Sequence, residues 1–265
     1  LVKVHHKVDA GFHVDFMVHF NQRGYTDLLR QETERIGNSP YHDDSKASFF
    51  DRPGKGDAST FFADLDGNLD YLTGHGFVSV PTGNHDIGRV RTGRTYEEVK
   101  ALYAMLFSLP GVPFLYYGDE IGMDAVPGLG NFEGSYNRSS ARTPMQWAKG
   151  AKAGFSTASP AKFYLPLDPK PGRPSVAEQE KDPASLLSFT RKMLALRAAN
   201  PALGNTGDLK VLYVKPNTAP VVYLRGKGKQ TCVCAFNPFG KEEVAIFGLE
   251  KASKYRELLV SPGVK

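Results

Sequence analysis

Two short apolar segments that each run into a polar cluster, with a well-marked helix between them, constrain the fold of this chain most strongly. Residues 77–81 and 112–117 have the length and the apolar content of strands. The first is followed by the polar residues 82–86 and the second by residues 118–120. Strands that alternate with helices in this way form parallel β-α units, and the loops at the C-terminal ends of such strands carry the chemistry. The sequence therefore predicts that both polar clusters lie at one edge of a parallel sheet.

The helix between these segments has signals at both ends. Thr95 and Glu98 have the spacing of a capping box, in which each side chain bonds a free backbone N–H of the first turn. Residues 109–111, Leu-Pro-Gly, end the helix. Its apolar residues recur at the spacing of one buried stripe: Val99, Leu102, Tyr103 and Leu106. We therefore expect an amphipathic helix that connects two parallel strands.

Residues 124–181 are rich in Gly, Pro and Ser and are too many for a simple connection. We expect a structured loop over a site or between domains. A second helix follows, with Asp182 as its predicted N-cap and Pro183 in its first turn. Asn200 and Pro201 end it.

After Gly204 the pattern changes to short β-rich runs that turn residues separate, at 209–214, 221–224, 231–236, 244–247 and 255–260. This pattern predicts a small antiparallel sheet domain. Cys232 and Cys234 lie two residues apart in one of these runs. Such neighbours in a strand point to the same face and seldom form a disulfide, so we expect two buried free thiols.

Composition excludes several classes of protein. Apolar residues make up 41% and charged residues 23% of the chain, so it can bury a core and is not disordered. No apolar run reaches the roughly 18 residues that a membrane span requires, and we expect no membrane partner. The net charge of +5 is scattered and not interleaved with aromatic residues, which argues against nucleic acid as a partner.

Four segments resemble motifs of the alpha-amylase family of glycoside hydrolases and occur in the family's order. They are VPTGNHD at residues 80–86, LPGVPFLYYGDEIGM at 109–123, ARTPMQW at 141–147 and DPASLLSFTRKMLALRAANPAL at 182–203. The third segment, together with the Gly-Phe-Ser that follows at 154–156, is most similar to the branch of alpha-glucosidases, oligo-1,6-glucosidases and trehalose synthases. The resemblance covers residues 11–265.

The resemblance implies an α/β fold, a (β/α)8 TIM barrel followed by a small all-β sandwich. Residues 77–81 and 112–117 would be barrel strands seven and eight, and residues 11–20, whose apolar residues alternate, strand six. We therefore expect a C-terminal fragment with barrel strands six to eight. Residues 1–204 would be a partial catalytic barrel and residues 205–265 an antiparallel β domain that is itself truncated. Such a fragment is expected to be inactive alone.

The resemblance also implies a retaining mechanism, in which one carboxylate attacks the anomeric carbon and a second carboxyl group protonates the leaving oxygen. By its motif, Asp86 corresponds to the third carboxylate, which binds sugar hydroxyls and stabilises the transition state. His85 corresponds to a donor to sugar hydroxyls in the same pocket, and Arg142 to an arginine that shapes the glucose pocket. Three aromatic residues that could stack on sugar rings are expected to pack in the core instead: Tyr116, Tyr117 and Trp147.

The nucleophile has two interpretations. Residues 11–15 read Gly-Phe-His-Val-Asp and match the family's nucleophile strand, Gly-Phe-Arg-hydrophobic-Asp, except at His13, so Asp15 is one candidate. A general-acid Glu should then end another strand before the NHD motif, yet the only glutamates in that interval lie in the polar stretch LLRQETERIG. In the favoured interpretation this strand is non-catalytic, and both the nucleophile and the acid precede Leu1.

The implied activity is retaining hydrolysis of alpha-glucosidic bonds in short alpha-glucans or disaccharides, with an alpha-glucan or oligosaccharide as the binding partner. Two alternatives stay open: a trehalose-synthase-like transglycosylase, and a non-catalytic amylase-like protein that binds sugar or serves as a scaffold. No cofactor is expected, a calcium requirement is left open, and no histidine has the spacing of metal ligands. The free thiols favour the cytoplasm, while the sequence does not determine the oligomeric state.

Overall fold

The computed structural model describes residues 58–72, 74, 76–85, 89–129, 138–216, 218, 220–238, 242–249 and 255–260. The strand expected at residues 11–20, with the candidate nucleophile Asp15, lies outside these described residues, and so does Asp86. The interpretation of the first barrel segment and the position of the Asp86 side chain therefore stay predictions.

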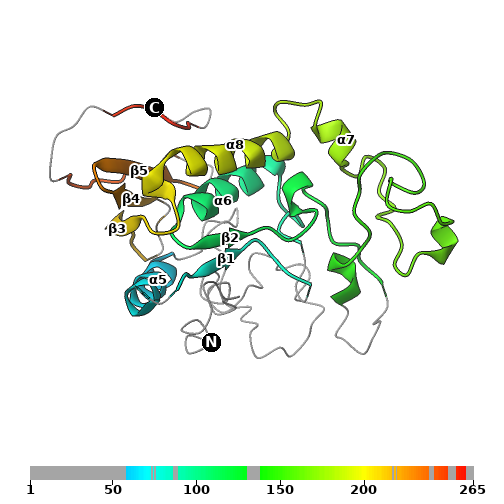
Figure 1. Cartoon of the computed structure of the whole chain (residues 1–265), viewed down its shortest axis with the longest axis horizontal. Helices are drawn as coiled ribbons and strands as arrows, with labels where there is room; N and C mark the ends of the chain where they lie inside the picture. Colours follow the sequence, from blue (N-terminus) through cyan, green and yellow to red (C-terminus); the bar gives the residue numbers. More distant parts are fainter. Residues whose placement is uncertain are drawn as a thin grey trace.

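A parallel β-α-β unit lies at the centre of the described structure (Figure 1). β1 (Ser79–Pro81) and β2 (Val112–Phe114) pair in parallel, and α6 (Tyr96–Ser108) connects them, which confirms the predicted arrangement. β2 is shorter than expected. The backbone N–H of Tyr116 bonds the side-chain hydroxyl of Thr82 (3.1 Å from N to Oγ1), so the strand ladder does not continue to this residue.

α6 begins where the sequence predicts. The Thr95 hydroxyl accepts a hydrogen bond from the Glu98 N–H, and the Glu98 carboxylate accepts one from the Thr95 N–H (2.6 Å from Oε2 to N), which completes the capping box. Leu109 is the C-cap. The predicted buried stripe is confirmed, because all four of its residues are buried: Val99, Leu102, Tyr103 and Leu106.

α8 (Leu186–Ala199) packs against α6, as Figure 1 shows. Its N-cap is Ser185, so the prediction of Asp182 as the N-cap is wrong. Asp182 instead accepts a bond from the backbone N–H of Ala184 (2.8 Å from Oδ1 to N), and this local turn delays the start of the helix. The helix ends at the C-cap Asn200, as predicted.

An antiparallel sheet of three strands follows the helices, in the order β3-β4-β5. Its strands are β3 (Asp208–Tyr213), β4 (Val221–Lys227) and β5 (Gln230–Phe236). This confirms the small antiparallel sheet that the sequence predicts. The two cysteines of β5 are free thiols, as expected, and burial raises the pKa of Cys234 to about 12.

The two further strands predicted at residues 244–247 and 255–260 are wrong, because the described residues there form no strand. Val244 and Ile246 are 74% and 84% exposed. An apolar run becomes a strand only where a neighbouring strand pairs with its backbone and a core covers one of its faces. Among the described residues, no strand pairs with either run, and Val244 and Ile246 are exposed, although Leu258 and Leu259 pack partly against the core.

The Gly- and Pro-rich stretch after residue 123 carries only short helices in its described part. No helix of the described ranges is both long and apolar enough to cross a membrane. The remaining elements are α5 (Ser59–Leu72), η1 (Asp119–Ile121), η3 (Arg138–Ala141), η4 (Pro160–Lys162), α7 (Val176–Gln179) and η5 (Pro201–Leu203).

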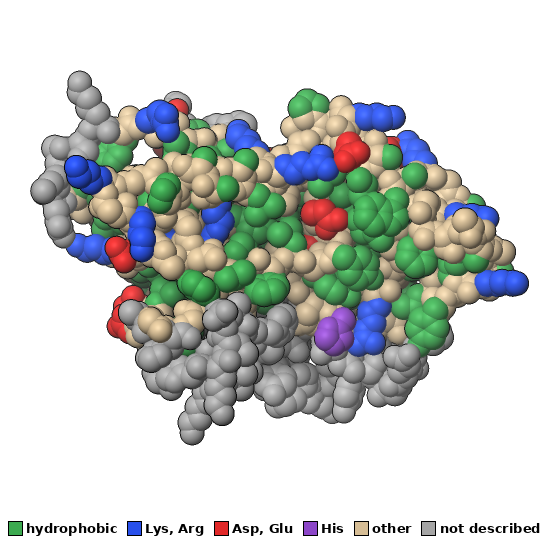
Figure 2. Space-filling view, in the orientation of Figure 1, with side chains coloured by type: hydrophobic (Ala, Val, Ile, Leu, Met, Phe, Trp, Pro, Cys, Tyr) green, Lys and Arg blue, Asp and Glu red, His purple; other side chains and the backbone are tan. Residues whose placement is uncertain are grey.

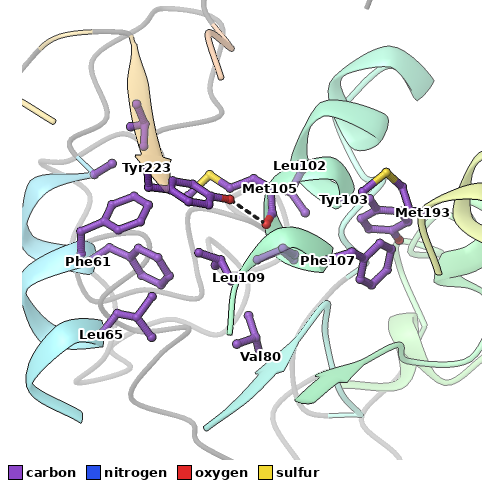
Figure 3. Packing of buried hydrophobic residues seen from close by; sticks show 14 of the residues in the cluster. Phe61, Leu65, Val80, Leu102, Tyr103, Met105, Phe107, Leu109, Met193 and Tyr223 are labelled. Carbon is purple, nitrogen blue, oxygen red and sulfur yellow. Dashed lines mark hydrogen bonds between the residues drawn. The ribbon is translucent and has the colours of Figure 1, made fainter. Parts of the chain in front are cut away.

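One hydrophobic core joins the helices to the antiparallel sheet (Figure 3). The ring of Phe62 in α5 lies 5.5 Å from that of Tyr223 in β4, measured between centroids. The Tyr223 hydroxyl donates to the Met105 carbonyl of α6 (3.3 Å). Met193 of α8 packs beside Tyr103 of α6. The division of the chain into domains at residues 204 and 205 stays a prediction.

Candidate active site

The polar residues that follow β1 and β2 meet at one edge of the parallel pair. The N–H of Thr82 bonds the Phe114 carbonyl (2.8 Å), which extends the pairing one step beyond β1. The Thr82 hydroxyl accepts from the Tyr116 N–H and donates to Asp119 (2.8 Å from Oγ1 to Oδ2). Three hydrogen bonds therefore tie Thr82, directly after β1, to the segment that contains and follows β2.

Asp119 is fully buried at this edge. Its carboxylate accepts from Thr82 through Oδ2 and pairs with Arg89 through Oδ1 (3.1 Å to Nη1). Its backbone carbonyl accepts from the Tyr103 hydroxyl (2.9 Å). Burial raises the pKa of the Asp119 carboxyl to about 6, although Arg89 and the Thr82 hydroxyl act in the opposite direction. The Arg89 guanidinium, 3.1 Å from Oδ1, favours the ionised carboxylate, and the two side chains form a buried ion pair.

Arg89 is also fully buried. Its guanidinium carbon lies 4.6 Å from the ring centroids of both Tyr116 and Tyr117, a cation–π distance, and its Nη1 also donates to the Tyr117 carbonyl. Two of its nitrogens, Nε and Nη2, have no hydrogen-bond partner within the described ranges. Asp119 is therefore the carboxylate that compensates the Arg89 charge among these residues.

Two of the three predicted site residues come together at the same edge. The Nε of Arg142 donates to the His85 carbonyl (2.7 Å), although 57 positions separate them in the chain. The Tyr117 hydroxyl donates to the carbonyl of Thr143, which follows Arg142 in the ARTPMQW segment (2.7 Å). This segment is thus held against the residues that follow both strands. The side chain of His85 is exposed and that of Arg142 is half-buried.

The prediction that the three aromatic residues pack in the core is wrong for two of them. Trp147 is 51% and Tyr117 39% exposed, while Tyr116 is half-buried against Arg89. Tyr116 and Tyr117 lie beyond the end of β2, and Trp147 lies on the loop that follows. Figure 2 shows that hydrophobic side chains gather over the middle of the displayed face, whereas the Lys and Arg side chains there are dispersed.

Sequence reasoning placed Thr82 and Asp119 in the two polar clusters of this edge but gave neither a role in the site, and it missed Arg89. Asp119 belongs to a polar cluster that the sequence places after a strand, but nothing local marks its burial or its pairing with Arg89. Glu120 beside it is half-buried, and burial raises the pKa of its carboxyl. No group of three or more His, Cys, Asp and Glu residues that could hold a metal ion occurs among the residues that the structure describes.

Comparison with known proteins gives a consistent picture. Residues 51–206 match the family model for the alpha-amylase catalytic domain. Over 130 residues the chain is 49% identical to the trehalose synthase/amylase TreS of Mycobacterium tuberculosis. The matched region covers 44% of this chain and 21% of TreS. Over 170 residues it is 33% identical to a probable alpha-glucosidase of Rhizobium meliloti. This matched region covers 58% of this chain and 30% of that protein.

Among solved structures, the chain resembles the trehalulose synthase MutB from Pseudomonas mesoacidophila MX-45, with a TM-score of 0.58 and 25% identity over 68% of this chain and 38% of MutB. A MutB variant in complex with glucose is equally similar, with a TM-score of 0.57 and 25% identity over 68% of this chain and 38% of the variant. The chain therefore spans well under half the length of each of these proteins.

Proposed function

This chain belongs to the alpha-amylase family, and on that premise we propose that it supplies the transition-state-stabilising side of a site that cleaves alpha-glucosidic bonds in short alpha-glucans or disaccharides with retention. One observation carries the proposal. His85, directly before Asp86, and Arg142 meet at the C-terminal edge of the parallel strands β1 and β2. Barrel enzymes place their active sites at this end of the strands.

In the proposed site, Asp86 binds sugar hydroxyls and stabilises the positive charge that develops on the sugar ring in the transition state. His85, whose side chain is exposed, donates to a hydroxyl of the same sugar. Arg142 donates to the His85 carbonyl and so holds His85 against the ARTPMQW segment. The nucleophile and the general acid are not assigned to described residues.

We extend the proposal to the fold. β1 and β2 correspond to strands seven and eight of a (β/α)8 barrel, with α6 between them, and β3, β4 and β5 belong to the β-sandwich that follows. The similarity to MutB, with its TM-score of 0.58, supports this assignment.

A second candidate activity is transfer of the glucosyl group to another sugar, as in a trehalose-synthase-like transglycosylase. The 49% identity to TreS favours it. Tyr117 and Trp147 present partly exposed rings beside or on the ARTPMQW segment, and an aromatic face suits the retention of a sugar acceptor in place of water.

The test uses the complete protein encoded by the reading frame that contains this chain. Release of glucose and formation of transfer products are measured with maltose, isomaltose, sucrose and trehalose. We expect Asp86→Asn to lower kcat by at least about 10²-fold, because a transition-state contact is lost. Asp66→Asn on the exposed side of α5 is the matched control and should leave kcat unchanged.

The outcomes separate the candidates. Glucose as the main product supports hydrolysis, whereas interconversion of the disaccharides supports transfer. Binding of glucose without turnover of any of the four sugars would favour the non-catalytic alternative. Equal kcat values for Asp86→Asn and Asp66→Asn would contradict the role of Asp86.

A further inference from the structure

Two residues on either side of Asp86 in the sequence bond the same carboxylate, that of Asp119. Thr82 lies before Asp86 and Arg89 after it. Asp119 accepts from Thr82 through Oδ2 (2.8 Å) and from Arg89 through Oδ1 (3.1 Å). We propose that Asp119 is a positioning residue that fixes the turn carrying Asp86 through these two bonds, an inference that rests on the proposed function of Asp86. We call the set Thr82, Arg89 and Asp119 the Asp119 bridge.

Asp119 itself does not reach a sugar. Its side chain is 1% exposed, each carboxylate oxygen already has a partner, and its backbone carbonyl accepts from the Tyr103 hydroxyl (2.9 Å). Any effect of Asp119 on catalysis must therefore pass through Thr82 and Arg89. This distinguishes it from the residues that contact the substrate in the proposal.

The partners of Asp119 are held in turn by other contacts. Thr82 is bonded through its N–H to Phe114 and through its hydroxyl to the N–H of Tyr116. Arg89 lies 4.6 Å from the Tyr116 and Tyr117 ring centroids. Thr82 and Arg89, which precede and follow Asp86 in the sequence, are thus both held to the segment after β2.

Fixing this turn matters for rate because catalytic groups act at defined distances. A displacement of about 1 Å costs on the order of 10²-fold in rate. A transition-state-stabilising carboxylate acts mainly after binding, so its displacement should lower kcat more than it raises KM.

The decisive variants are at Thr82, because a change at Arg89 or Asp119 alters a buried charge and threatens folding. In the complete protein, Thr82→Val removes the hydroxyl at constant shape and Thr82→Ser keeps it. Thr218→Val is the matched control, since it removes a threonine hydroxyl that donates to the nearby Lys215 carbonyl (3.0 Å), far from the proposed site in the sequence. Two quantities are measured: kcat and KM on the best sugar substrate, and amide hydrogen exchange of residues 82–85 and 89–95.

We expect Thr82→Val to lower kcat by about 10- to 100-fold and to speed exchange in both segments, Thr82→Ser to restore most of both, and Thr218→Val to change neither. Unchanged exchange in Thr82→Val would overturn the proposal, and so would faster exchange with an unchanged kcat. If the complete protein turns over no sugar, the proposed function fails, and the exchange measurement still decides whether the Asp119 bridge holds the turn.

Discussion

The two ends of β2 each bury arginine side chains, but they satisfy them differently. At the C-terminal end, Arg89 pairs with Asp119 and leaves Nε and Nη2 without hydrogen-bond partners among the described residues. At the N-terminal end, Arg197 donates to the carbonyls of Phe107, Leu109 and Gly111 and to the Asn205 side-chain oxygen (2.9 Å). Among the described residues, Arg225 donates to four backbone carbonyls, those of Ser108, Gly204, Gly207 and Asp208.

Under the proposed function, the two ends of β2 have different roles. The carbonyls that Arg197 and Arg225 bind lie around the end of α6 and the start of β3, so these arginines join the helices to the antiparallel sheet. Burial lowers the pKa of both, that of Arg197 to about 10, with repulsion between them as a further cause for Arg197. The Arg89 end is held by one carboxylate next to the proposed catalytic turn. In barrel enzymes the N-terminal face serves stability and the C-terminal face serves catalysis.

Removal of the Arg89 charge should have the largest effect. Arg89→Met leaves the Asp119 carboxylate buried without its cation, and loss of one member of a buried ion pair costs about 3–5 kcal/mol. We expect a loss of this size in the free energy of unfolding at pH 8, measured by chemical denaturation of the complete protein.

This loss should depend on pH. Without Arg89, the pKa of folded Asp119 rises further above its unfolded value, because Arg89 is the main group that lowers it. A raised carboxyl pKa makes the folded state bind more protons than the unfolded state, so stability falls as pH rises toward the folded pKa. The penalty of Arg89→Met should therefore be larger at pH 8 than at pH 6. The double variant Arg89→Met/Asp119→Leu should recover much of the loss, and a pH-independent penalty would contradict the ion pair.

Arg225→Met should come second and sharpen the comparison. It leaves the buried carbonyls of Ser108 and Gly207 without this donor, at a cost of about 2–4 kcal/mol in the free energy of unfolding. Because its hydrogen-bond acceptors are carbonyls and not a carboxylate, the loss should be equal at pH 6 and pH 8. Arg191→Met, which breaks an exposed ion pair with Glu180, is the control and should change stability by less than about 0.5 kcal/mol. A pH-dependent loss for Arg225→Met would remove the distinction between the two ends.

The sequence predicts the features that depend on neighbouring residues. The capping box of Thr95 and Glu98 is local, and the structure confirms it. The parallel pair with polar ends is also confirmed, because a repeated strand and helix pattern permits few arrangements. Asp182 shows the limit of this reasoning: two nearby residues suit the N-cap, and a turn bond to Ala184 decides in favour of Ser185.

The sequence does not predict features that depend on distant partners. Arg89 and Asp119 are 30 positions apart, and charged residues are mostly exposed, so their burial follows only from the folded chain. The strand predicted around the exposed Val244 and Ile246 is wrong for the converse reason. Their apolar character predicts a strand, but it does not show whether a partner strand exists. Of the site, the motif locates His85 and Arg142, whereas the contacts that hold them come from the structure.

Tyr223→Phe should have a smaller effect at the N-terminal end of β2. The Tyr223 hydroxyl lies 2.6 Å from the Ser108 Oγ and 3.3 Å from the Met105 carbonyl, in a fully buried place. Loss of these bonds, with the ring retained, should cost about 1–2 kcal/mol. Tyr255→Phe, whose side chain is 55% exposed, is the matched control and should be neutral. An equal denaturation midpoint for the two variants would show that this hydroxyl does not stabilise the junction of α6 and β4.

Thr95→Ala should have the smallest effect and tests whether the two ends of α6 are independent. The variant removes the N-cap of α6 but leaves the Arg197 and Arg225 contacts at its C-terminal end intact, so the expected loss is about 1 kcal/mol. Thr95→Ser retains the capping hydroxyl and should restore most of it. Hydrogen exchange should quicken in the first turn of α6 and stay unchanged at residues 105–109, because the buried arginines hold that end separately. Faster exchange at both ends would show that α6 opens as one unit, and the contrast between the two ends of β2 would then not extend to the helix that connects them.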